Sequence, residues 1–126
     1  MPRPPRRRID IGERALRFAV NVSQILERLD RNNPTVRATV HQLLRSSTGI
    51  GANLEEATGA LTKAEFISKC GIALREACES LYWLDFLSRA LPPMAPSLDA
   101  PLKEADRLVA ILTTIVRNAR TSPRRG

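Results

Sequence analysis

Residues 45–87 decide the fold, and they read RSSTGIGANLEEATGALTKAEFISKCGIALREACESLYWLDFL. Apolar side chains recur there at every third or fourth position, the spacing that places them on one face of an α-helix. The pattern ends near Gly59, and Thr62 with Glu65 makes a capping box, which is typical of a helix start. The stretch therefore predicts the end of one helix, a short turn and the beginning of another.

The same spacing continues on both sides and predicts four helices. Asn33 followed by Pro34 is a typical N-cap and first-turn pair, so we expect the second helix to begin there, and a loop at residues 91–97 precedes the fourth. Short connections favour antiparallel neighbours, so the expected fold is all-α, an antiparallel up-down-up-down four-helix bundle. The expected core positions, helix by helix, are Ile11, Ala15, Phe18, Val22, Ile25 and Leu29; Val36, Val40, Leu43, Ser47, Ile50, Leu54 and Ala57; Phe66, Cys70, Ala73, Ala77, Leu81, Leu84 and Leu91; and Leu98, Leu102, Ala105, Val109, Leu112, Val116 and Ala119.

Three segments of this sequence resemble the signature of the 23S rRNA intervening-sequence protein family. They are GIGANLEEA at residues 49–57, TKAEF at residues 62–66 and IALREA at residues 72–77. The resemblance implies a four-helix bundle that assembles as a closed homopentamer with a central channel. Related accessory variability-determinant proteins of diversity-generating retroelements bind reverse transcriptase and structured RNA, so the resemblance also implies RNA or a nucleoprotein as a partner.

The composition is that of an ordinary globular domain. The chain has 126 residues, of which 43% are hydrophobic and 26% charged, and a chain of this length can bury one core without disulfides. The basic N-terminus MPRPPRRR is not followed by an unbroken apolar run, and the longest apolar run, residues 108–116, is too short to span a membrane. We therefore expect a cytoplasmic protein with no membrane contact.

Positive charge is concentrated at the two ends of the chain. The net charge is +7, yet residues 9–116 contain twelve basic and thirteen acidic residues. The pattern predicts a bundle at residues 9–120 between basic tails at residues 1–8 and 121–126. The remaining basic residues are all arginines: Arg3, Arg6, Arg7, Arg8, Arg117, Arg120, Arg124 and Arg125.

These eight arginines predict a nucleic-acid-binding face. In an up-down-up-down bundle both groups emerge at the same end, and the guanidinium fork suits phosphate oxygens. The tails carry no aromatic residue, so binding should depend on phosphate and on salt concentration. The alternative is that Arg117 and Arg120 only complement the negative end of a helix dipole and that the tails are solvated.

The predicted third helix has more apolar surface than one bundle needs. A second stripe, which includes Ile67, Gly71 and Tyr82, widens its apolar face and predicts contact with another copy of the chain. Small residues such as Gly51 predict close approach of a second helix, in the same subunit or in the next. The interface candidates are therefore Gly51, Ile67, Gly71, Tyr82 and Trp83, with ligand stacking as the alternative for the two aromatic residues.

The sequence contains no recognisable catalytic or metal-binding pattern. The single histidine, His41, has Ala38 three residues before it, so the Glu-x-x-His motif of di-iron bundles is missing. The cysteines Cys70 and Cys78 match no zinc-site spacing. We therefore expect no catalytic residue, no metal site and no cofactor.

Polar residues near the predicted seams of the second and third helices form one further candidate site. Asn53, Glu56 and Glu76 predict a structural polar cluster, inside or beside the core, that fixes helix register or a subunit contact. A hydrolytic or metal-binding role is the alternative for this cluster. Glu79, four residues after Arg75, predicts an ordinary surface ion pair on one helix.

Taken together, these patterns predict a non-enzymatic four-helix-bundle protein that forms a homo-oligomer, a pentamer, and contacts RNA or a nucleoprotein through its terminal arginines. The alternative is a structural protein-interaction scaffold with no role in nucleic-acid binding. Removal of the arginines discriminates between the two, because only the first requires them.

Overall fold

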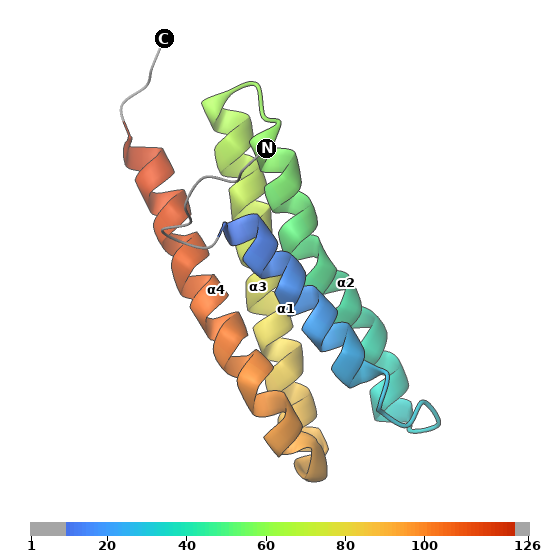
Figure 1. The fold of residues 1–126 in the computed structure, drawn as a ribbon. Coiled ribbons are helices and arrows are strands. Elements are labelled where there is room, and N and C mark those ends of the chain that lie inside the picture. The colour runs from blue at the N-terminus through green and yellow to red at the C-terminus, as the bar shows by residue number, and fades with distance from the viewer. Residues whose placement is uncertain (1–9, 123–126) are drawn as a thin grey trace, which may run out of the picture.

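The computed structural model describes residues 10–122 as four α-helices that run alternately up and down (Figure 1). Each helix packs against the next along the chain, and the first also contacts the last, which confirms the predicted bundle. Most of both predicted basic tails lies outside the described residues. The helices are α1 (Ile11–Leu26), α2 (Pro34–Thr58), α3 (Lys63–Ala90) and α4 (Ala95–Thr121), with a short 3-10 turn, η1 (Pro92–Met94), before α4.

Side-chain caps begin the helices where the sequence predicts them. The Asn33 side chain accepts a hydrogen bond from the Thr35 N–H at 2.8 Å, and Thr62 Oγ1 accepts one from the Glu65 N–H at 3.1 Å. The Glu65 carboxylate in turn accepts the Leu61 N–H at 3.2 Å, one residue before the capping residue. These bonds satisfy N–H groups that have no partner inside the helix.

The core seam of α2 is buried throughout, as predicted, whereas the buried faces of α3 and α4 are rotated from the predicted ones. Ser80 of α3 and Leu108 of α4 are fully buried, but Leu81 and Val109 beside them are only half-buried. A straight α-helix has 3.6 residues per turn, so a seam read at a spacing of 3.5 drifts around a long helix. Helices of 28 and 27 residues are long enough to show this drift.

Two helix boundaries differ from the sequence expectation. The loop expected at residues 91–97 is shorter, because α4 begins at Ala95 and places Pro96 in its first turn, where no N–H is required. Helix α1 ends at Leu26 rather than Leu29, although Leu29 stays buried in the turn that follows. With 16 residues, α1 is the shortest of the four α-helices.

Small side chains line the contact between α2 and α3. Ser46 and Ser80 are both fully buried, and Ser80 Oγ donates a hydrogen bond to Ser46 Oγ at 2.9 Å. Ser46 Oγ donates in turn to the Leu43 carbonyl at 3.2 Å, so neither hydroxyl is left without a partner. Ala73 and Ala77 of α3 are also fully buried, so the buried face of α3 carries small side chains that allow close packing.

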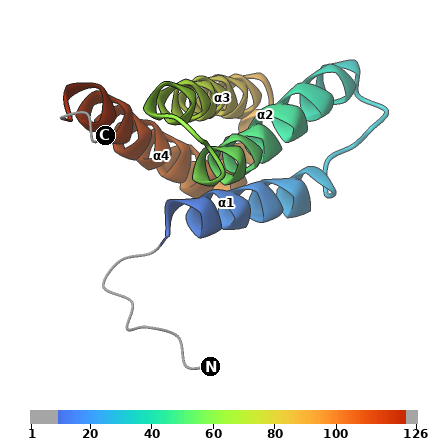
Figure 2. The same cartoon turned by 90° about the horizontal axis from the view of Figure 1, so that it is seen from above.

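Helix α1 packs on the bundle away from α3. Seen from above, α1 and α3 lie on different sides of α2 (Figure 2), and α1 contacts only α2 and α4 among the described helices. A Cβ atom added at Gly51 of α2 would lie 3.7 Å from Ala15 Cβ of α1, so this glycine lies where α1 crosses α2. Within residues 10–122, no helix combines the length and apolar character needed to cross a membrane.

The small residues of the α2–α3 contact lead to a stability prediction. Ser80→Leu should destabilise the protein by about 1–3 kcal/mol, because the added carbons have no space. Ser80→Ala should cost less than about 1 kcal/mol, since Ser46 keeps its bond to the backbone. Urea unfolding measures both, with the exposed Ser68→Leu on α3 as the matched control. Equal losses for Ser80→Leu and Ser68→Leu would contradict close packing here.

Candidate functional site

A row of polar side chains follows one edge of the α2–α3 contact. Arg45 of α2 lies between two carboxylates of α3, with its Nη2 at 2.9 Å from Glu79 Oε2 and its Nη1 at 4.0 Å from Glu76 Oε2. Trp83 Nε1 donates a hydrogen bond to Glu79 Oε2 at 3.1 Å. The expected ion pair between Glu79 and Arg75 is wrong, because Arg45 reaches Glu79 across the helix contact instead.

Glu76 lies directly on the backbone of α2. A methyl group added at Gly49 would overlap the Glu76 carboxylate and lie 3.1 Å from its Cδ, so the glycine leaves the space that the carboxylate fills. The Glu76 side chain is only 18% exposed. Burial raises the pKa of Glu76 above its ordinary value, and the attraction of Arg45 offsets only part of that rise.

Asn53 and Glu56 lie farther along the same edge. Asn53 Nδ2 donates a hydrogen bond to the Gly49 carbonyl at 2.8 Å, one turn earlier on α2. Glu56 is exposed and pairs with Lys69 of α3, with 2.7 Å between Oε1 and Nζ. Among the residues described, Asn53, Glu56 and Glu76 do not hydrogen-bond to one another, although all three lie along the α2–α3 edge. The role of the three residues as one cluster stays a prediction.

The outer face of α3 carries an exposed aromatic group. Tyr82 is 62% exposed and Phe86 38%, and Trp83 between them is half-buried. The rings meet edge to face, with centroids 5.0 Å apart for Tyr82 and Trp83 and 6.0 Å apart for Trp83 and Phe86. Phe86 was not predicted, although its position one turn after Tyr82 is the signal that would have found it. Of the other candidates on this helix, Ile67 is half-buried and a Cβ at Gly71 would meet open space.

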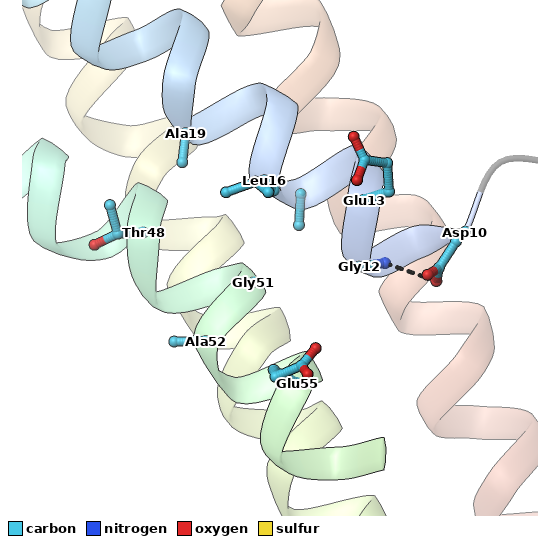
Figure 3. A pocket seen from close by; sticks show the side chains of 10 residues that line it. Asp10, Gly12, Glu13, Leu16, Ala19, Thr48, Gly51, Ala52 and Glu55 are labelled. Atoms are coloured by element: carbon cyan, nitrogen blue, oxygen red, sulfur yellow. Dashed lines mark hydrogen bonds between the residues drawn. The ribbon is translucent and has the colours of Figure 1, made fainter.

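A shallow groove separates the beginning of α1 from the C-terminal half of α2 (Figure 3). Its volume is about 460 Å³, and small or apolar residues, among them Leu16, Ala19, Gly51 and Ala52, line much of it. Asp10, Glu13 and Glu55 place carboxylates at the end where α1 begins. We refer to this feature below as the α1–α2 groove.

A second groove, of about 640 Å³, lies between α1 and α4. Its lining includes Ile11, Ile111 and Ile115, with Asp10 and Asn118 at its polar margin. Arg14 and Glu104 join the two helices through a double hydrogen bond of 2.7 and 2.9 Å, and this carboxylate raises the pKa of the Arg14 guanidinium. Because Asp10 and Asn118 line the same groove, the first described residue and the last turns of α4 lie at the same end of the bundle.

Two of the eight predicted nucleic-acid-binding arginines lie within the described chain. Arg117 and Arg120 are exposed in the last turns of α4, and neither has an ion-pair partner within 4.0 Å among residues 10–122. Lys63, at the beginning of α3, donates a hydrogen bond to the Ser122 carbonyl at the end of α4. The other six are outside the described residues: Arg3, Arg6, Arg7, Arg8, Arg124 and Arg125.

The cysteine and histidine side chains, which could bind a metal ion, lie in different environments: one is buried and two are exposed. Cys70 is buried in the core, which raises the pKa of its thiol, whereas Cys78 is exposed on α3. His41 is exposed on α2. Within the part of the chain that the structure describes, His, Cys, Asp and Glu form no group of three or more that could hold a metal ion.

The matches to known proteins include a family model and a solved structure. The family model of the 23S rRNA-intervening sequence proteins matches residues 7–114. A crystal structure of a protein with unknown function from the S23 ribosomal protein family of Bacteroides thetaiotaomicron superposes with a TM-score of 0.74 at 31% identity, covering 86% of this chain and 99% of that one. No curated protein matches the chain significantly.

The contact between Gly49 and Glu76 predicts a non-additive pair of substitutions. Gly49→Ala alone should gain little stability, because the Glu76 carboxylate must move away from its place on α2. In a Glu76→Ala background the same change should gain about 1 kcal/mol, the usual advantage of alanine over glycine inside a helix. Urea unfolding of the four proteins gives the coupling energy, expected to be at least about 0.5 kcal/mol. The same effect in both backgrounds would contradict the contact.

The raised pKa of Glu76 predicts a pH-dependent gain in stability for Glu76→Gln. The folded protein binds a proton at this carboxyl more readily than the unfolded chain does, so stability falls as pH rises from the unfolded pKa, about 4.3, through the folded pKa. Glu76→Gln should therefore be more stable than the natural protein at neutral pH, and the difference should vanish below that window. Urea unfolding at neutral pH and at a pH below about 4.3 measures this difference. The exposed Glu27→Gln is the control. A gain that does not change with pH would refute burial as its cause.

Proposed function

We propose a non-enzymatic role for this chain, which belongs to the 23S rRNA-intervening sequence protein family: five copies assemble and contact RNA, free or in a nucleoprotein, through arginines at one end of the bundle. The observation that carries this proposal is the position of Arg117 and Arg120 at the end of the bundle where the described chain both begins, at Asp10, and ends. In the proposed assembly each of the five copies contributes its own Arg117 and Arg120.

The proposed assembly is supported by the outer face of α3. Tyr82 and Phe86 are among the few large apolar side chains that the described bundle leaves exposed, and both rings pack against Trp83. Exposed apolar groups that gather in one place, rather than singly, are typical of protein contact surfaces. Helix α1 does not contact α3, and the other described helices leave both side chains exposed.

The proposed RNA contact is supported by the distribution of charge. Many acidic side chains of the bundle are paired with arginine or lysine, as at Arg45 with Glu79 and Lys69 with Glu56. Arg117 and Arg120 have no such partner among the described residues, so both guanidinium groups are free to bind phosphate. A surface of this kind contacts the phosphate backbone and discriminates weakly between sequences.

A scaffold that binds only protein is the second candidate function. The exposed aromatic group on α3 favours it, because this face has the character of a protein contact and does not involve the terminal arginines. In this case neutralisation of the arginines should change neither the oligomeric state nor the affinity for a protein partner. The same experiment therefore decides between the two candidates.

The test is RNA affinity as a function of salt, measured by fluorescence anisotropy with a labelled RNA hairpin. Neutralising Arg117 and Arg120 to serine should weaken binding and make the slope of log K against log salt less steep by about 0.7–0.9 for each lost phosphate contact. Serine at Arg28 and Arg31, exposed at the opposite end of the bundle, is the matched control and should leave both quantities unchanged.

A further variant with all eight terminal arginines changed to serine should lose RNA binding. If the natural protein fails to bind the hairpin at low salt, or if this variant binds it as well as the natural protein does, the proposed RNA contact is refuted. The protein-binding scaffold then remains. Light scattering on the same samples measures whether assembly is independent of the arginines.

A further inference from the structure

We infer that Tyr82 of one copy seats in the α1–α2 groove of the next copy. The inference rests on the homo-oligomer proposed above and names the two surfaces that join its subunits. Tyr82 cannot occupy the groove of its own chain, since α3 has no contact with α1 in the described bundle. Each copy therefore carries a projecting surface on α3 and a receiving surface between α1 and α2, and α1 and α3 lie on different sides of α2 (Figure 2).

The projecting surface is built to hold its shape. Tyr82 is the most exposed aromatic side chain of the group, and its ring packs edge to face with that of Trp83. Trp83 is itself held by its hydrogen bond to Glu79, which is paired with Arg45. A series of contacts through Trp83, Glu79 and Arg45 thus connects the phenol ring to α2 and restricts its motion. A side chain that is already restricted loses little conformational entropy when it binds.

The receiving surface has the size and the lining for such a ring. The α1–α2 groove, of about 460 Å³, has small residues at Ala19, Gly51 and Ala52, while Leu16 at its side is 56% exposed (Figure 3). Gly51 contributes no side chain to the groove, and the backbone of α1 lies within 4 Å of the place where its Cβ would be. Burying a tyrosine ring there would also cover Leu16, which the single chain leaves in water.

Charge complementarity points to a second copy as the occupant. Carboxylates of Asp10, Glu13 and Glu55 line one end of the groove, and no lysine or arginine lines it. On α3, Arg75 and Arg89 lie seven residues to either side of Tyr82, so they share its face at about 10 Å along the helix.

Two of these charged groups lack a partner of their own. Arg75 and Glu55 both have no ion pair within 4.0 Å among residues 10–122, whereas Glu13 is paired with Arg17. With Tyr82 in the groove, an arginine two turns away would reach the carboxylate end. Such a pair adds orientation and speed of association more than affinity.

This pairing fixes the symmetry of the assembly. The two joined surfaces are different parts of the chain, so the contact is heterologous, and repetition of it generates a ring where the rotation closes. A contact between two identical α3 faces would give only a two-fold dimer. The two arrangements predict different behaviour when defective subunits are mixed.

The test uses two variants, each defective in one surface. Tyr82→Asp should destroy the projecting surface, and Ala52→Glu, at an exposed position, should block the groove, so that light scattering finds each alone at the 14.0 kDa chain mass. Mixed, they should form a heterodimer of twice that mass, because the tyrosine of one variant still meets the open groove of the other. Ala38→Glu on α2 and Leu61→Asp before α3, both exposed, are matched controls that should assemble normally.

A cross-link detects the same contact even if a single interface is weak. Cys78 is exposed one turn before Tyr82, so an Ala52→Cys chain should form intermolecular disulfides between positions 78 and 52 on oxidation. Ala38→Cys should form none. A natural protein that is monomeric refutes the proposed homo-oligomer itself. A natural oligomer that forms no 78–52 disulfide, or whose mass is unchanged by Ala52→Glu, overturns only the pairing of tyrosine and groove.

Discussion

The close contact between α2 and α3 is the constraint on which the rest of the structure depends. Ser46 and Ser80 meet there in the fully buried core, and Gly49 leaves the space that the Glu76 carboxylate fills. A larger side chain at Ser80 would have no space there, because protein interiors are packed as densely as organic crystals. Two of the segments that resemble the family signature, residues 49–57 and 72–77, supply Gly49 and Glu76 to this contact.

The same contact determines which surfaces the bundle presents to its surroundings. Helix α3 is held between α2 and α4, which turns Tyr82 and Phe86 outward. Helix α1 is the shortest helix and crosses α2 at Gly51, which leaves a shallow groove beside Leu16. Two apolar surfaces of opposite shape therefore follow from one arrangement of helices, and both lie outside the core.

Many charged side chains are paired in the body of the bundle, whereas those at the end of α4 are unpaired among the described residues. In the body, ion pairs such as Arg14 with Glu104 and Arg45 with Glu79 join neighbouring helices and neutralise one another. At the end of α4, Arg117 and Arg120 face solvent. Arg14 and Glu104 are largely shielded from solvent, whereas Arg45 is half-exposed, and exposed ion pairs contribute little to stability.

The sequence by itself determined the four helices, the caps at Asn33 and Thr62 and the whole core seam of α2, because these depend on neighbours within four residues along the chain. The role of Tyr82 and Trp83 in an interface stays a prediction. Only the tertiary structure decided which face of α3 is buried and that Glu79 pairs with Arg45, 34 residues away, rather than with Arg75. It decided too that Gly49 adjoins a carboxylate. Those outcomes depend on how two helices approach, and the spacing of residues along one helix carries no information about the helix beside it.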